Sequence, residues 1–319
     1  MSVKIVRQLT GYLWILDGLL QLQPKMFTSA FATKIILPMA NGQPEIVSLP
    51  MHWAASLFLM KTIIFNSFIV AIQLTIGVLI LSKKTARVGL LMSMIWGLLV
   101  WSIGEAYGGI LSGSFSLMMG APGAGLIYAI LSLSIYKKQD DERPSFWLVF
   151  VWLAIWLFGA ISFVLDNHSL NAINAMLRSN LNNLPGWLAY VDNQFSNFIG
   201  SLYSHATFNS NTMGMAMGAG KSVASNPGYW LIIVFGLIEL TIGLGVLLNS
   251  KIRKTAITSG CIILVFFWLV GQNAGNYYSG LMTDLNTAPI LIIMGLVLLK
   301  NDYTKPLLEF GQFIKNKII

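Results

Sequence analysis

Long apolar runs are the feature that most constrains this sequence. Several stretches of about 20 residues carry almost no charge, and a helix rising 1.5 Å per residue crosses a hydrocarbon core of about 30 Å in that length. Of the 319 residues, 55% are hydrophobic and 10% are charged, whereas soluble domains contain about 25% charged residues. The sequence therefore predicts an all-α polytopic membrane protein whose main partner is the lipid bilayer.

Eight runs are expected to be transmembrane helices. They are Ile5–Leu22, Ile63–Leu81, Val88–Leu111, Pro122–Tyr136, Phe146–Leu165, Trp230–Leu248, Thr255–Gln272 and Ala288–Leu299. Short cytoplasmic loops carry an excess of Lys and Arg. With the N-terminus inside, all but five of the 20 basic residues face the cytoplasm, and the exceptions are Lys25, Lys34, Lys61, Arg178 and Lys221. We therefore predict a multi-pass plasma-membrane protein with cytoplasmic N- and C-termini.

The start of the chain allows a second interpretation. Lys4 and Arg7 precede an apolar run, and Ala30-Phe31-Ala32 resembles the cleavage site of a signal peptide. Asp17 lies inside the run and argues against cleavage, so we expect the first span to be retained. A single cysteine, Cys261, excludes an intramolecular disulfide framework, and we expect it to be a small packing residue.

The two halves of the chain resemble one another. The stretch WSIGEAYGGILSG at 101–113 matches WLVGQNAGNYYSG at 268–280, at an offset of 167 residues. The same offset relates Ala121-Pro122 to Ala288-Pro289, and LTIG at 74–77 recurs at 240–243. We expect two tandem four-helix repeats, 1–140 and 141–319, the second with a long outer loop at 166–229. An even number of spans per repeat makes both repeats point the same way across the membrane.

The outer loops are expected to lie on the membrane surface or to cap the bundle. In the second loop, the residues from Trp187 to Tyr203 have apolar side chains at helical spacing, which is typical of an amphipathic helix.

Glu105 is a charged residue near the outer end of the third predicted span. On a continuous helix, Trp101, Gly104, Glu105, Gly108 and Ser112 would form one stripe. One interpretation is a packing seam across which a protonated Glu105 donates a hydrogen bond. In the other, an ionisable group inside a membrane exchanges a proton or binds a ligand, and Asp17 in the first span shares this second interpretation.

At two pairs of corresponding positions, one half of the chain has an acidic side chain where the other half has an amide. Gln73 and Glu105 in the first half correspond to Glu239 and Gln272 in the second. Such exchanges preserve shape and remove a titratable proton. We hypothesise that each half keeps one proton-exchanging group and that the amides orient a ligand.

The fourth and eighth predicted spans are short. The helix after Pro122 could begin below the outer surface and direct free N–H groups into a cavity beside Glu105, where an anion or a quinone carbonyl would bind. In the other half, Asn286 and Thr287 would open the helix in the same way. Ordinary capping of a short helix is the alternative.

Several motifs are incomplete. GAGKS at 218–222 lacks the first glycine of a phosphate-binding loop, because residue 215 is methionine, so we exclude nucleotide binding. Met213, Met215 and Met217 could offer thioethers to Cu(I) beside His205, but no spaced His or Cys pair supports a metal site, and we predict none. The net charge of +8 is attributed to membrane topology, so nucleic acid is not expected as a partner.

The first span, with Arg7, Gly11 and Gly18 in the pattern R-x3-G-x6-G, resembles the opening helix of DoxX/DoxD-type membrane proteins. The sixth span, IELTIGLGVLL with Glu239, resembles the second helix of that family. The resemblance implies a quinone-linked membrane subunit acting beside a second redox subunit, as DoxD does in thiosulfate:quinone oxidoreductase.

The chain itself has no redox cofactor motif, so a quinone is the one cofactor expected. Under this interpretation three acids exchange protons with the quinone, and a set of polar and aromatic residues binds it. The acids are Asp17, Glu105 and Glu239, and the binding set is Gln73, Gln272, Trp101, Trp268, Asn286 and Thr287. A transporter of a small anionic or sulfur-containing solute and a non-catalytic membrane scaffold remain as alternatives.

Overall fold

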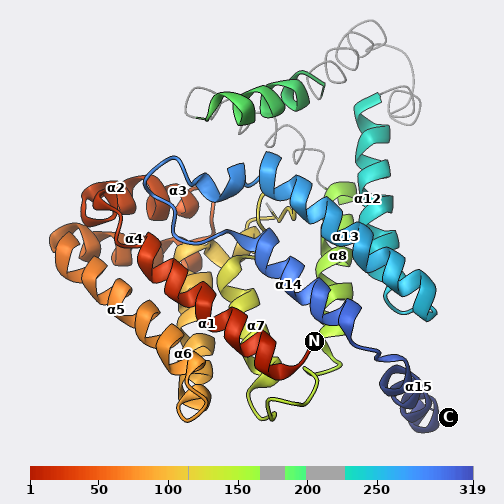
Figure 1. The fold of residues 1–319 in the computed structure, drawn as a ribbon. Helices are drawn as coiled ribbons and strands as arrows, with labels where there is room; N and C mark the ends of the chain where they lie inside the picture. The colour runs from red at the N-terminus through yellow and green to blue at the C-terminus, as the bar shows by residue number, and fades with distance from the viewer. Residues whose placement is uncertain (114, 166–183, 199–226, 319) are drawn as a thin grey trace, which may run out of the picture.

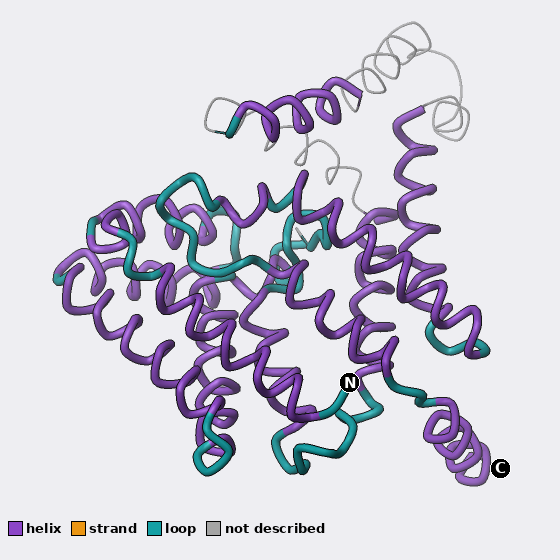
Figure 2. Tube along the Cα trace, viewed as in Figure 1, coloured by secondary structure: helices purple, strands orange, loops and turns teal. Residues whose placement is uncertain are grey.

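The computed structural model describes residues 1–113, 115–165, 184–198 and 227–318, and every regular element in these ranges is a helix. Figure 1 shows a bundle of long helices with shorter helices across one end, and Figure 2 shows how little of the described chain lies in loops. Three helical stretches are long and apolar enough to cross a membrane: Thr62–Leu81, Ala86–Gly104 and Ser250–Val270. The chain is therefore a helical membrane protein.

The first half of the bundle has four long helices. They are α1 (Val3–Leu20), α5 (Thr62–Leu81), α6 (Ala86–Leu99, continued by the wider turn η3, Val100–Gly104) and α7 (Ala124–Ile135). Helix α1 packs on α5, and α6 packs on both α5 and α7. The α1–α5 crossing is close because Gly11 and Gly77 face each other: a Cβ added to Gly77 would lie 2.8 Å from the carbonyl oxygen of Gly11.

The second half contains four long helices with the same order of packing. They are α8 (Leu148–Leu165), α12 (Pro227–Gly245), α13 (Ser250–Val270) and α14 (Thr287–Lys300). Helix α8 packs on α12, α13 packs on α14, and α14 also contacts α7 of the first half. Buried Trp152 and Trp156 of α8 fill the space left by Gly260 of α13, whose Cβ would lie 2.7 Å from the Trp152 ring.

Shorter helices cover the outer end of the bundle. Between α1 and α5 the chain forms η1 (Pro24–Phe27), α2 (Ser29–Phe31), η2 (Ala32–Ile36), α3 (Leu37–Ala40) and α4 (Glu45–Met60). These elements share a core of their own around Met26, Met51 and Phe58. A helix at 186–198 lies above the second half (Figure 1), so the helix expected from Trp187 is present over its described part. Its buried face differs from the expected apolar stripe, because Asp192 and Ser196 are buried beside Leu188 whereas Val191 is exposed. The C-terminal helix α15 (Thr304–Ile318) follows α14.

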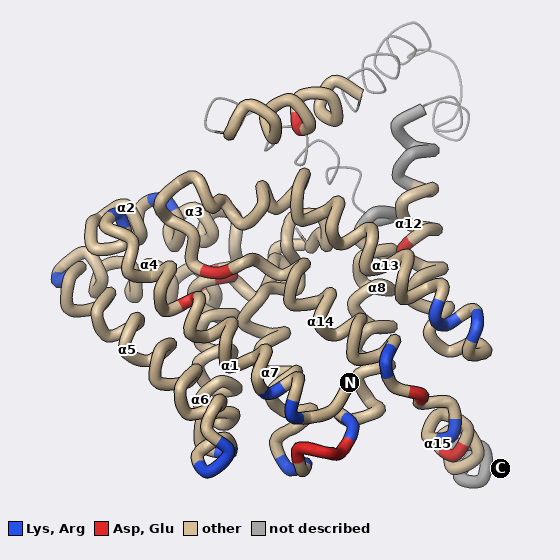
Figure 3. Tube along the Cα trace, viewed as in Figure 1, with Lys and Arg blue, Asp and Glu red and all other residues tan. Residues whose placement is uncertain are grey.

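Basic residues gather at one end of the bundle. Figure 3 shows Lys and Arg at the α5–α6 turn, the α7–α8 loop, the α12–α13 turn and the segment after α14, all on the side opposite the short outer helices.

The third predicted span is shorter than expected. We expected a helix from Val88 to Leu111, but α6 and η3 end at Gly104, and a left-handed turn, η4 (Ala106–Gly109), follows. The stripe from Trp101 to Ser112 is therefore wrong beyond Glu105. Glycine tolerates the positive φ of this turn. Gly108, for which the sequence suggested a role in helix packing, instead helps to end the helix together with Gly109.

Candidate functional site

Two left-handed turns interrupt the bundle near its outer end. In the first, Ala106, Tyr107, Gly108 and Gly109 have φ values of 48°, 57°, 63° and 75°. In the second, η6 (Asn273–Asn276), the four residues 167 positions later have φ values of 49°, 49°, 70° and 58°. The residue before each turn also matches, since Glu105 has φ −114° and ψ 7° and Gln272 has φ −101° and ψ 8°. Each turn redirects the chain so that the preceding side chain reaches the start of the next helix.

Glu105 and Gln272 both cap helices. The Glu105 carboxylate accepts the backbone N–H of Gly125 at 3.1 and 3.2 Å, in the first turn of α7. In the second half, the Gln272 side-chain oxygen accepts the N–H of Ala288 in the first turn of α14, at 3.1 Å. The expectation that the first turn of α7 leaves its N–H groups free beside Glu105 therefore needs correction, because Glu105 itself binds one of them.

Tryptophans one turn earlier secure the same two segments. The Trp101 indole N–H donates to the carbonyl oxygen of Pro122 at 2.7 Å, and that of Trp268 donates to the carbonyl of Leu285 at 2.8 Å. Gly123 is required beside them, because a Cβ there would collide with the Glu105 carboxylate. Trp101 and Trp268 thus hold the segments that precede α7 and α14.

Asp17 forms a buried hydrogen bond with Tyr128 inside the bundle. The Tyr128 hydroxyl of α7 donates to its Oδ2 at 2.5 Å, while Oδ1 is buried and has no hydrogen-bond partner among the residues that the structure describes. The Asp17 side chain is 1% exposed. Trp14, one turn below Asp17, stacks on Tyr128 with ring centroids 4.3 Å apart and donates to Ser93 at 2.7 Å. Asp17 is therefore enclosed beside two aromatic side chains, and one of its carboxyl oxygens has no partner among the described residues.

Asp284 brings a third acid to the same region. It lies in the segment between η6 and α14, and its charge interacts with those of Asp17 and Glu105. Burial raises the pKa of Asp284, although hydrogen bonds from the Thr283 hydroxyl and the Asn286 N–H oppose that shift. Among the described residues, no three His, Cys, Asp or Glu side chains lie close enough together to hold a metal ion.

The other predicted site residues are more scattered. Asn286 caps α14 by accepting the N–H of Thr287, as the sequence predicts, and the Thr287 hydroxyl donates to the carbonyl of Gly120. Gln73 of α5 is buried, and its side-chain oxygen has no hydrogen-bond partner in the described part of the chain.

Glu239 of α12 is separate from the acids around Asp17. It is fully buried, and its tip lies against Gly159 of α8 and near Leu117. Within the described part of the chain, neither of its carboxyl oxygens has a hydrogen-bond partner. The structure thus brings Asp17 and Glu105 together and leaves Glu239 apart.

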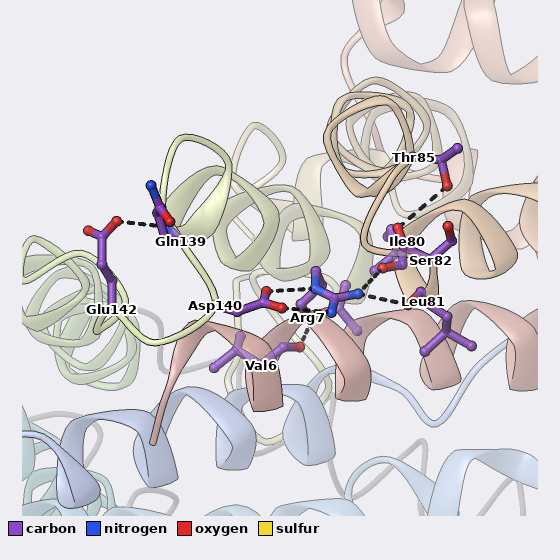
Figure 4. A network of polar contacts seen from close by, with 10 residues as sticks. Val6, Arg7, Ile80, Leu81, Ser82, Thr85, Gln139, Asp140 and Glu142 are labelled. Atoms are coloured by element: carbon purple, nitrogen blue, oxygen red, sulfur yellow. Dashed lines mark hydrogen bonds and ion pairs between the residues drawn. The ribbon is translucent and has the colours of Figure 1, made fainter.

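Arg7 lies near the end of α1 that is opposite Asp17 and binds groups from neighbouring elements there. Its guanidinium donates to the carbonyl oxygens of Ile80 and Leu81, at 2.6 and 2.9 Å, and forms an ion pair with Asp140 at 3.2 Å (Figure 4). It thereby satisfies the free carbonyls at the end of α5. The arginine of the R-x3-G-x6-G pattern joins α1, α5 and the loop after α7, and it lies far along α1 from Asp17.

Two participants were missed in the sequence. Tyr128 is the one hydroxyl-bearing aromatic between Pro122 and Ile135, and Asp284 is the one acid in the segment before Asn286. Because each is the single residue of its kind in its segment, the sequence offered a signal for both Tyr128 and Asp284. The copper hypothesis for His205 and Met213, Met215 and Met217, and the GAGKS segment, lie outside the described residues.

Comparisons with known proteins add no relative: no family profile, curated protein or solved structure matches this chain.

Proposed function

We propose that this chain is an eight-span membrane subunit in which Asp17 and Tyr128 exchange protons with a bound quinone. Its electrons would come from a second redox subunit. The observation that carries the proposal is the buried Asp17–Tyr128 pair, which has a free carboxyl oxygen at the outer end of the bundle.

The proposed architecture is two four-helix units, as in DoxX/DoxD-type proteins. Helices α1, α5, α6 and α7 would correspond to α8, α12, α13 and α14. Three observations support this: the like order of packing, the matching left-handed turns 167 residues apart, and the helix caps made by Glu105 and Gln272. The basic turns at one end of the bundle (Figure 3) support cytoplasmic N- and C-termini in a plasma membrane.

Proton exchange is assigned to Asp17 rather than Glu105 for a chemical reason. Gln272 makes the same cap as Glu105 without a titratable proton, so the helix cap needs no ionisable group. The Asp17 carboxylate, in contrast, accepts its hydrogen bond from the Tyr128 hydroxyl and from no backbone N–H of the described residues. Its free Oδ1 can carry a proton to a ligand, and an ionisable group kept inside a membrane has a functional role by default.

The balance of the reaction assigns a role to each participant. Reduction of a quinone to a quinol takes two electrons and two protons. The partner subunit supplies the electrons. A bound quinone would take one proton on each of its two oxygens. The Asp17 carboxyl would hold a proton beside one of these oxygens, Tyr128 would orient that carboxyl through its hydroxyl, and Asp284 would return a proton to Asp17 from the outer side.

A titration with a ubiquinone analogue in nanodiscs tests this proposal. Asp17→Asn and Tyr128→Phe remove the proton-exchanging groups, and Glu105→Gln is the matched control because glutamine already caps α14. We expect each of the first two to weaken binding about tenfold, equivalent to one charge-assisted hydrogen bond, and the control to bind within about twofold of wild type.

Two outcomes would contradict the proposal. Absence of saturable binding in the wild type would leave a scaffold or a transporter of a small anionic solute. Equal weakening by Glu105→Gln and Asp17→Asn would move the site to the α7 cap.

A further inference from the structure

The surface of α12 and α13 contains an apolar groove distant from the acids around Asp17. It has a volume of about 710 Å³ and lies between Val234 and Gly245 on α12 and Lys251 and Ser259 on α13. Leu237, Leu244 and Leu248 line it and are 54%, 44% and 50% exposed. A volume of this size is in the range of ligand sites rather than of packing defects.

One cationic side chain, that of Lys251, lines one end of the groove. Lys251 is exposed and forms no ion pair with an acid of the described residues. Thr255, one turn further along α13, adds a hydroxyl to the same end. The rest of the lining is almost wholly hydrocarbon.

The turn that carries Lys251 is held rigidly. The Arg253 guanidinium donates to the carbonyl oxygens of Val246 and Leu248, at 2.8 and 2.9 Å. The Asn249 side chain accepts the N–H groups of Lys251 and Ile252. Because Asn249 already satisfies these two N–H groups, an anion at this end would bind the lysine ammonium rather than the helix terminus.

We propose that this groove binds one anionic phospholipid from the leaflet that surrounds the α12–α13 turn. From Val234 to Gly245 the groove follows α12 for roughly 17 Å, which is about the roughly 15 Å of hydrocarbon in one leaflet. An acyl chain lies along the leucines and isoleucines, and the lipid phosphate lies at the Lys251 ammonium. Basic residues beside a membrane helix attract anionic headgroups, and here the charge stands at the end of an apolar groove.

The test is native mass spectrometry of the purified full-length protein, titrated with phosphatidylglycerol or phosphatidylcholine that carry the same acyl chains. Lys251→Gln removes the charge in the groove. Lys254→Gln is the matched control, because Lys254 is exposed on the same helix and does not line the groove. We expect wild type and the control to prefer phosphatidylglycerol by on the order of fivefold, and Lys251→Gln to retain both lipids equally.

A second variant tests the apolar part. Thr241 lines the groove and is exposed, so Thr241→Phe should fill the groove and reduce retention of both lipids without lowering thermal stability. Equal retention of the two lipids by wild type, or equal effects of the Lys251 and Lys254 variants, would overturn the proposal.

Two other occupants are also tested. If a quinone analogue displaces phosphatidylglycerol and is itself lost in Thr241→Phe, the groove holds an isoprenoid tail and the lipid assignment fails. A dimer that Thr241→Phe dissociates would assign the surface to a second copy of the chain and also overturn it. Neither result bears on the Asp17 titration, which uses different variants.

Discussion

At the scale of single residues, Glu105 illustrates how an acid inside a membrane protein can serve as a helix cap. Its carboxylate accepts the Gly125 N–H, and Gln272 makes the corresponding bond to Ala288 without a charge. A capping oxygen contributes typically about 1 kcal/mol to stability.

We therefore expect Glu105→Gln to leave the melting temperature nearly unchanged and Glu105→Ala to destabilise the protein by about 1 kcal/mol or more. Thermal unfolding followed by tryptophan fluorescence measures both changes. If the glutamine variant were as unstable as the alanine variant, the carboxylate charge rather than the cap geometry would be important.

Gly97 provides a second prediction at the same scale. A Cβ at Gly97 would lie 2.6 Å from the carbonyl oxygen of Gly125, so α6 and α7 approach backbone to backbone. Gly97→Ala should therefore cost about 1–3 kcal/mol through overpacking. Gly104→Ala is the control, since its Cβ would make an ordinary contact of 3.6 Å with Val100. Equal melting temperatures for the two variants would show that α6 can shift away from α7 at no cost.

At the scale of elements, the helix at 186–198 packs on the second left-handed turn. Leu184 and Leu188 contact the region of Ala274 and Tyr278. In the first half, Ala106 of the first left-handed turn belongs to an apolar cluster that includes Met51 and Ala55 of α4. The outer helix instead carries Asp192, which is fully buried, and neither of its carboxyl oxygens has a hydrogen-bond partner among the described residues.

Packing of this outer helix should depend on pH. Burial raises the pKa of Asp192 to about 7, and its neighbour Tyr278, with a pKa of about 12, stays neutral throughout the relevant range. A carboxyl whose pKa is higher in the packed state favours packing at low pH. The preference for packing declines as the pH rises from about 4, which is the ordinary pKa of aspartate, to about 7. Above about pH 7 the contribution of Asp192 to packing no longer changes with pH.

Hydrogen exchange of the amides at 186–198, corrected for the intrinsic effect of pH on exchange, measures this packing. We expect greater protection at pH 5 than at pH 8 in the wild type and equal protection in Asp192→Asn. A wild-type helix with the same protection at both values would contradict the account.

At the scale of the whole molecule, labelling of single introduced cysteines can establish which end of the bundle faces the cytoplasm. Cys261 is the sole cysteine, so a Cys261→Ala background accepts single probes. An impermeant maleimide should label Asn41→Cys in intact cells, and should label Lys84→Cys and Lys137→Cys only after permeabilisation, because these turns lie at opposite ends of the bundle. Labelling of Lys84→Cys from outside would reverse the proposed orientation.

Sequence reasoning located the long helices within a few residues, because each is a long apolar run bounded by basic or glycine-rich turns. It placed a continuous helix across 88–111 because Gly104 and Gly108 also fit a helix-packing motif. Only the backbone shows that Gly108 has φ 63° and belongs to a turn.

The site was harder to predict for a related reason. Asp17 and Glu105 were identified because a charge inside an apolar run is conspicuous. Tyr128 lies 111 residues from Asp17 in sequence, and no local pattern records a contact made by packing α1 against α7. The roles of Glu105 and Gln272 as caps likewise depend on the left-handed turns that follow them.

The most direct test of the central proposal is an infrared difference spectrum of the protein–quinone complex in nanodiscs, recorded as the quinone is reduced electrochemically. A buried carboxyl that gives up or gains a proton produces a difference band of the protonated C=O group. We predict such a band in the wild type and in Glu105→Gln, a shifted band in Tyr128→Phe, and none in Asp17→Asn. A band that survives in Asp17→Asn and disappears in Glu105→Gln would contradict the account and assign proton exchange to the cap of α7.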